Sequence, residues 1–257
     1  MFITIDGCDG CGKTTQQIRL GKWLQSKGRD TVLCRDPGGT TLGNKIREIV
    51  LGGNIKNFDN KNITKNKIYN NGNNDGKFQD EMLNDNISDK SNKLNVSDKG
   101  SDNYGENIHI CNVAEMLLFM ASRSQLVNEI IYPAIMSGKD VISDRFLISN
   151  IVYQGYAGGV SIEAIEFIGE IATSGIKPDL GIILDIPYEV SVKRMNNRLK
   201  DRIESKGEKY HKSVCDGFLD YAKKNPHYAV IDASPAADVV ELAIRQAVET
   251  KINYENL

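Results

Sequence analysis

An eight-residue segment near the N-terminus has the pattern of a phosphate-binding loop. It reads Gly-Cys-Asp-Gly-Cys-Gly-Lys-Thr, that is, glycine, four residues and then Gly-Lys-Thr. Glycines let successive backbone N–H groups turn inward around a phosphate, and the following helix adds the positive end of its dipole. We expect Lys13 to reach the β- and γ-phosphate oxygens and Thr14 to offer its hydroxyl to Mg²⁺. The pattern therefore predicts a nucleoside triphosphate site made by Gly7, Cys8, Asp9, Gly10, Cys11, Gly12, Lys13 and Thr14.

The two cysteines of this loop form a Cys-x-x-Cys pair, which in other proteins indicates zinc or redox chemistry. No second pair of ligands accompanies them, so we interpret them as occupants of variable loop positions. Because Cys8 and Cys11 lie beside Lys13 and a helix N-terminus, we expect a thiolate and rapid alkylation of at least one. The alternative is that both are small, buried and inert.

Three further segments place charged residues beside glycines or strand ends. They read Arg-Asp-Pro-Gly-Gly-Thr from Arg35 to Thr40, Asp-Arg-Phe from Asp144 to Phe146, and Asp-Arg-Ile-Glu from Asp201 to Glu204. With the phosphate loop, they resemble in type and order the motifs of bacterial thymidylate kinases, where Glu is usual at the position of Asp36. The resemblance covers nearly the whole chain outside residues 54–108. It implies an enzyme that uses ATP and Mg²⁺ to convert dTMP into dTDP for DNA synthesis.

The resemblance also implies how an acceptor nucleoside is held. Phe119 should stack on the thymine ring, and Arg123, four residues later on the same helix face, should hydrogen-bond its carbonyl edge. Ser149 and Asn150 should read the base, and Tyr153 should crowd a ribose 2′-OH. Deoxyribonucleotides would be selected in this way.

The remaining implied roles concern phosphate and catalysis. Arg47 and Arg145 match positions that hold the acceptor phosphate, Arg35 and Pro37 belong to the same substrate site, and Asp9 should lie near Mg²⁺ and the acceptor. One branch of the family has a loop arginine where this chain has Gly10. The segment Asp201–Glu204 matches the lid of the family, and the cation that stabilises the transition state should therefore come from this lid. The expected catalytic residues are Asp9, Lys13, Arg145 and the lid candidates Arg194, Arg198 and Arg202.

Other functions remain open at this stage. The near alternative is a kinase for another nucleoside monophosphate or a deoxynucleoside, which Arg123 and Tyr153 disfavour. The far alternative is a non-enzymatic P-loop switch, which the lid arginines disfavour. A GTPase would need an Asn-Lys-x-Asp base reader, and the sequence has none. The three histidines lie outside all motifs, and transfer to an ionised phosphate requires positioning and charge rather than a base.

The elements that must position these residues alternate between strand and helix. We therefore expect an α/β fold with a parallel five-stranded sheet covered by helices on both faces. The resemblance implies that this is a P-loop fold of nucleoside monophosphate kinase type with a mobile lid. Apolar runs predict strands at Phe2–Asp6, Thr31–Cys34, Asp140–Ser143, Leu180–Asp185 and Tyr228–Ile231. Helical periodicity predicts helices at Thr14–Ser26, Leu42–Leu51, Val113–Met136, Ile162–Ala172, Glu189–Arg198 and Ala236–Thr250.

Residues 54–108 interrupt this alternation. They contain 15 asparagines among Lys, Asp, Ser and Gly, a composition that buries too little apolar surface to offset its ordering entropy. We expect a disordered insertion within a single domain spanning residues 1–257. The alternative is a small independent domain.

Bulk composition sets outer limits on function. The 257 residues carry a net charge of −2, which gives no global basic field for nucleic acid or anionic membranes. No run approaches the roughly 20 apolar residues of a membrane span. Five cysteines without a disulfide pattern and no cleavable leader indicate the cytoplasm. The resemblance implies a homodimer formed through helices that flank the sheet.

Overall fold

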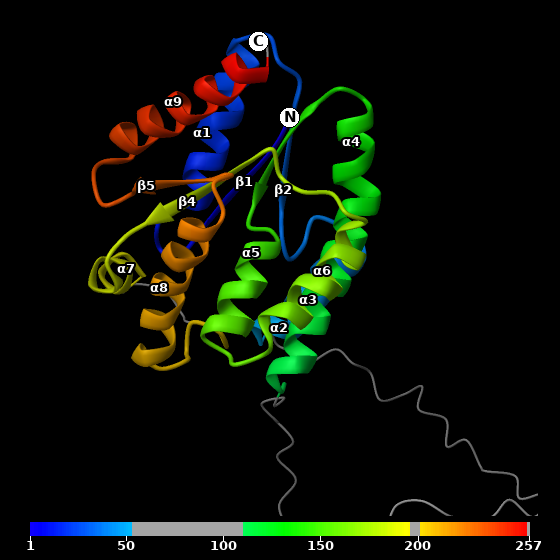
Figure 1. Ribbon diagram of the computed structural model, residues 1–257, viewed down its shortest axis with the longest axis vertical. Coiled ribbons are helices and arrows are strands. Elements are labelled where there is room, and N and C mark those ends of the chain that lie inside the picture. Colours follow the sequence, from blue (N-terminus) through cyan, green and yellow to red (C-terminus); the bar gives the residue numbers. More distant parts are fainter. Residues whose placement is uncertain (53–109, 196–200, 256–257) are drawn as a thin grey trace, which may run out of the picture. The chain divides into compact units, whose positions relative to one another are not determined.

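The computed structural model describes residues 1–52, 110–195 and 201–255. The predicted insertion at 54–108 lies outside these residues, as does Arg198. The described residues form one parallel sheet of five strands in the order β2-β3-β1-β4-β5, with helices on both faces (Figure 1). The predicted fold class is confirmed.

Each predicted strand is present, with its ends within one residue of the expected ones. Every residue is buried in β1 and β3, which lie inside the sheet, whereas the edge strands β2 and β5 are partly exposed. This difference explains why the inner strands are apolar runs rather than alternating patterns. The strand bounds are β1 Phe2–Gly7, β2 Thr31–Arg35, β3 Asp140–Asp144, β4 Leu180–Asp185 and β5 Tyr228–Asp232.

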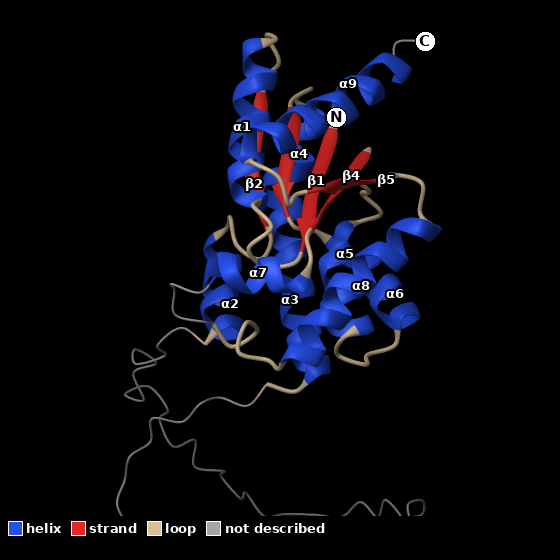
Figure 2. Ribbon diagram, turned by 90° about the vertical axis from the view of Figure 1, so that its left-hand side faces the viewer, coloured by secondary structure: helices blue, strands red, loops and turns tan. Residues whose placement is uncertain are grey.

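Two layers of helices enclose the sheet. α1 and α9 pack together on one face, and α4, α5 and α8 contact strands from the other (Figure 2). The helices are α1 Lys13–Ser26, α2 Thr41–Leu51, α3 Asn112–Leu126, α4 Tyr132–Met136, α5 Leu147–Asn150, α6 Ile162–Thr173, α7 Tyr188–Met195, α8 Glu208–Lys224 and α9 Ala237–Glu255, with π-helical turns η2 Val127–Ile131 and η3 Ile151–Tyr156. Within these described residues, no helix has the length and apolar run that a bilayer crossing requires.

The helices differ from the predictions in several places. The expected helix over 113–136 contains the π-helical turn η2, which directly precedes Pro133 in α4. Proline removes a backbone donor and disfavours regular α-helical bonding before it. The helix expected to reach Arg198 is described only to Met195. α8, and α5 with η3, were not predicted.

The chain order creates a crevice at the carboxyl ends of the central strands. After β1 the chain passes through α1 to β2 on one side, whereas after β3 it passes to β4 on the other side of β1. The loops after β1 and β3 therefore diverge, and ligands bind at such a switch point in open α/β sheets. The phosphate loop follows β1, and Arg145 follows β3.

Candidate active site

A cavity of about 410 Å³ opens at this crevice. Its walls come from the phosphate loop, the segment after β2, α2, α3, the segment after β3, η3 and the turn at residues 201–204. Most of the predicted site residues line it, namely Asp9, Gly10, Gly12, Lys13, Thr14, Arg35, Pro37, Arg47, Phe119, Arg123, Arg145, Ser149, Asn150 and Tyr153. Residues from distant parts of the sequence thus share one cavity.

The phosphate loop depends on glycine at its first position. Gly7 has a φ of 138°, and a Cβ there would lie 2.4 Å from the carbonyl oxygen of Leu184, closer than any side chain could tolerate. Lys13 folds back over the loop, with Nζ donating to the carbonyls of Cys8 at 2.8 Å and Gly7 at 3.3 Å. The loop therefore holds its ammonium group at the cavity wall.

Thr14 and Asp144 form the pair of oxygen ligands best suited to a divalent cation. The Thr14 hydroxyl donates to Oδ2 of Asp144 at 2.6 Å, and both residues line the cavity. Hydroxyl and carboxylate oxygens are the ligands that Mg²⁺ prefers alongside phosphate oxygens. The described residues contain no group of three or more His, Cys, Asp or Glu that could hold a metal by themselves. Asp9, the other predicted metal ligand, is engaged elsewhere.

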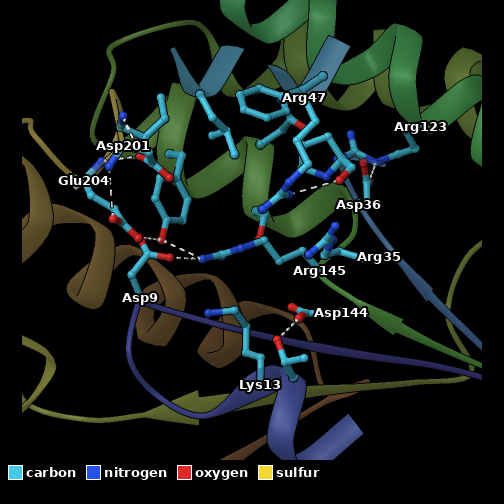
Figure 3. Close-up of a pocket in the computed structure, with 18 of the residues that line it drawn as sticks. Asp9, Lys13, Arg35, Asp36, Arg47, Arg123, Asp144, Arg145, Asp201 and Glu204 are labelled. Carbon is cyan, nitrogen blue, oxygen red and sulfur yellow. Dashed lines mark hydrogen bonds and ion pairs between the residues drawn. The ribbon is translucent and has the colours of Figure 1, made fainter. Parts of the chain in front are cut away.

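Arg145 occupies the centre of the site (Figure 3). Its backbone has a φ of 71°, which is uncommon for a residue with a side chain. Its Nη2 lies 2.5 Å from Oδ1 of Asp9, and its Nη1 donates to the carbonyl of Gly7 at 3.0 Å. The Tyr153 hydroxyl donates to the other Asp9 oxygen at 2.9 Å. Burial alone would raise the pKa of Asp9, but the charges of Arg145 and Lys13 outweigh it and lower that pKa.

Two further arginines at the cavity have no carboxylate partner in the part of the chain that the structure describes. Among the described residues, none forms an ion pair with Arg35 or Arg47. Within the described part of the chain, Arg47 donates only to the carbonyl of Pro37, at 3.1 Å. Burial, followed by repulsion from Arg35 and Arg145, lowers the pKa of Arg47. This uncompensated positive charge favours binding of an anion such as phosphate.

Arg123 is held in a buried ion pair rather than free in the cavity. Its Nε lies 2.5 Å from Oδ2 of Asp36, and its Nη2 donates to the carbonyl of Phe146 at 3.2 Å. Burial raises the pKa of Asp36, against the opposing charge of Arg123. Three of the five guanidinium N–H groups are used within the protein, counting the contact with Met120. No described residue accepts a hydrogen bond from the other two.

Several predicted residues do not line the cavity. Arg194 donates to the carbonyls of Ala233 and Ser234, at 3.0 and 2.9 Å. Arg202 pairs with Glu115, and Arg198 lies outside the described residues. Gly7, Cys8 and Cys11 also lie behind the wall.

The expected thiolate in the loop is wrong. Cys8 and Cys11 are 6% and 2% exposed. Hydrogen bonding with Cys11 lowers the pKa of Cys8, but the contact with Cys215 and burial outweigh it and raise that pKa to about 12. Burial raises the pKa of Cys11 well above its ordinary value. Desolvation of the loop interior thus outweighs the nearby positive charge of Lys13.

The cavity also contains residues that were not predicted as ligands. Five of them lie inside the motifs found in the sequence, so motif membership was the available signal. They are Asp36, Asp144, Asp201, Ile203 and Glu204. Gln154 had no signal beyond its position next to Tyr153.

Comparisons with known proteins give matches over most of the chain. The family model described as thymidylate kinase matches residues 5–69 and 101–244. The thymidylate kinase of Caldanaerobacter subterraneus subsp. tengcongensis is 34% identical over 249 residues, covering 96% of this chain and 94% of that protein. The thymidylate kinase of Thermosipho melanesiensis is 33% identical over 254 residues, covering 99% and 100%. The crystal structure of thymidylate kinase from Ehrlichia chaffeensis has a TM-score of 0.62 at 26% identity and covers 96% and 98%. The chain belongs to the thymidylate kinase family.

Proposed function

We propose that this chain transfers the γ-phosphoryl group of ATP to dTMP, giving ADP and dTDP. The observation that carries the proposal is the content of one cavity: a phosphate loop, the cations Arg35 and Arg47 that no described carboxylate pairs with, the aromatic ring of Phe119 and the buried Arg123. The phosphate loop suits the donor phosphates, Arg35 and Arg47 suit the acceptor phosphate, and Phe119 with Arg123 suits the acceptor base. The family and the names of its relatives supply the identity of the base.

On the donor side, backbone N–H groups of the loop and Lys13 would bind the β- and γ-phosphates. Thr14 and Asp144 would hold Mg²⁺, since their oxygens already meet at the cavity wall. When bound, this ion neutralises phosphate charge. The residues of the chain keep both phosphoryl groups in place.

On the acceptor side, Arg35, Arg47 and Arg145 would bind the phosphate of dTMP. That phosphate is already ionised, so no side chain has to remove a proton. Catalysis then consists of alignment and of stabilising the charge that develops between the two phosphates. Asp9 contributes indirectly, because it fixes the Arg145 guanidinium.

The base and sugar would be recognised at the other end of the cavity. Phe119 would stack on thymine, and the two free N–H groups of Arg123 would donate to a carbonyl of the base. The Ser149 hydroxyl already donates to Oδ1 of Asp6 at 2.7 Å, so we assign the polar contact with the base to Asn150. The Tyr153 ring would lie against the 2′ position of the sugar.

The lid would supply the cation for the transition state. We keep Arg194, Arg198 and Arg202 as candidates and expect at least one to act on turnover. Lid movement would have to break the present contacts of Arg194 with the turn after β5.

We also propose a cytoplasmic homodimer. Four exposed apolar side chains on the packed helices α3 and α6 support an interface: Val113, Leu117, Phe167 and Ile171, which are 47–69% exposed. Sedimentation should show a dimer that Phe167→Asp converts to a monomer. All five cysteines are free, as expected in a reducing compartment.

The decisive experiment measures ADP release with dTMP, dUMP, UMP, dCMP and AMP as acceptors. We expect the highest kcat/KM with dTMP and almost no activity after Lys13→Met. Equal activity on AMP or UMP would contradict the proposed function.

A further inference from the structure

Glu115 lies in the first turn of α3 and is completely buried. It does not line the cavity itself. Phe119, four residues later on the same helix face, does. Two other segments, the turn after residue 200 and η3, donate hydrogen bonds to the carboxylate of Glu115.

Two cations from the turn after residue 200 reach this carboxylate. Arg202 donates from Nη2 to Oε2, and Lys206 donates from Nζ to Oε1 at 3.1 Å. Arg202 also donates from Nε to the carbonyl of Val50, in the last turn of α2, at 2.8 Å. A buried carboxylate between two cations acts only as a hydrogen-bond acceptor.

A chain of two amides connects Glu115 to the cavity. Nε2 of Gln154 donates to Oε1 of Glu115 at 2.8 Å, and Oε1 of Gln154 accepts from Nδ2 of Asn150 at 3.0 Å. Both amides are 2% exposed and line the cavity. Because a carboxylate cannot donate, Glu115 fixes which end of the Gln154 amide faces it. Gln154 then fixes the orientation of Asn150 in the same way.

This polarity has a consequence for the ligand. Nδ2 of Asn150 is committed to Gln154, and no described residue donates to its Oδ1. Asn150 therefore offers an acceptor at the cavity. Thymine and uracil carry an N–H donor at N3, whereas cytosine carries an acceptor there.

We propose that Glu115 is a positioning residue for base selection. Through Gln154 it sets Asn150 to accept from N3–H, which favours thymine and uracil over cytosine. The inference rests on the proposed function, in which the base of dTMP occupies this end of the cavity.

Glu115→Gln tests the relay, because an amide at this position can donate as well as accept. The amide of Gln154, and then that of Asn150, can flip so that nitrogen and oxygen exchange places. The ratio of kcat/KM for dTMP to that for dCMP should then fall by roughly tenfold or more. The ratio for dTMP to dUMP should stay constant, since both bases present the same N3–H. Glu249→Gln, on the exposed side of α9, is the matched control and should change neither ratio.

Two more variants separate the relay from simple structural support. Adding Gln154→Glu to Glu115→Gln places an acceptor-only group beside Nδ2 of Asn150 again, and it should restore the discrimination against dCMP. Gln154→Met removes the relay while Glu115 keeps both cations, so it should lower the same ratio even if Glu115→Gln does not fold. An unchanged dTMP to dCMP ratio in Gln154→Met, or an equal loss for all three nucleotides, overturns the inference. A wild-type enzyme that does not prefer dTMP would instead contradict the proposed function.

Discussion

Arg123 and Asp36 form an ion pair in which the two side chains are 2% and 0% exposed, and Nε of Arg123 lies 2.5 Å from Oδ2 of Asp36. Arg123→Ala would leave this carboxylate buried and unpaired. We expect the free energy of unfolding to fall by about 3–5 kcal/mol and the KM for dTMP to rise. Urea unfolding and dTMP titration measure the two effects.

The combined variant Arg123→Met with Asp36→Asn should recover most of the stability, because no lone charge stays buried. It should not recover the KM for dTMP, since the donors to the base are still missing. Equal stability of the single and combined variants would contradict the interpretation of Asp36 as the partner of Arg123.

Substitution of Arg35 or Arg47 should weaken substrate binding without lowering the stability of the fold. Because neither has a described carboxylate partner, Arg35→Ala and Arg47→Ala should leave the melting temperature unchanged or higher. Loss of one charged hydrogen bond to phosphate, worth about 1.5–3 kcal/mol, should raise the KM for dTMP about 10-fold to 150-fold. The KM for ATP serves as the internal control. An increase confined to ATP would place these arginines on the donor side.

Tyr153 offers a test of sugar selection. Tyr153→Phe removes only the hydroxyl that donates to Asp9, so the preference for dTMP over its ribonucleotide should persist. Tyr153→Leu removes the ring edge, and we expect the ribonucleotide to gain relative kcat/KM. Both variants are compared in the same ADP-release assay. A loss of preference in Tyr153→Phe would assign selection to the hydroxyl instead of to the ring.

The lid arginines should differ in what they affect. Arg202→Ala leaves Glu115 with Lys206 as its remaining cation, so thermal unfolding should shift to lower temperature. At least one of the alanine variants at 194, 198 and 202 should lose about 10³-fold or more in kcat. Single-turnover measurements at saturating ATP and dTMP report this directly. Near-normal kcat in all three would remove the lid from catalysis.

Thiol labelling should follow exposure and pKa. Cys111 is exposed, and Cys215 is half-buried with its pKa lowered through its contact with Cys8. Both should react with iodoacetamide faster than Cys8, whose pKa of about 12 leaves little thiolate at pH 8. Labelling of Cys8 should speed up about tenfold per pH unit. Timed mass spectrometry gives the order, and Cys8 reacting first would contradict it.

The strands and the phosphate loop could be predicted because each depends on residues that are close together in the sequence. The strands were visible because buried parallel strands are apolar runs, and the loop was visible because its glycines are required by backbone geometry. α8 was missed although Val214, Phe218 and Ala222 recur every four residues and are buried, because charged residues surround that narrow stripe. The pairs Arg123–Asp36 and Glu115–Arg202 join residues 87 positions apart. Only tertiary packing reveals such partners.

Arg145 touches both halves of the cavity, since one guanidinium contacts Gly7 and Asp9 in the loop and Ser149 and Tyr153 on the acceptor side. A ligand that moves this guanidinium away from its contacts in one half of the cavity also changes the contacts that a ligand can make in the other half. We therefore expect the affinities for the two nucleotides to be thermodynamically linked. By reciprocity, whatever factor ATP applies to the dissociation constant of dTMP, dTMP applies to that of ATP.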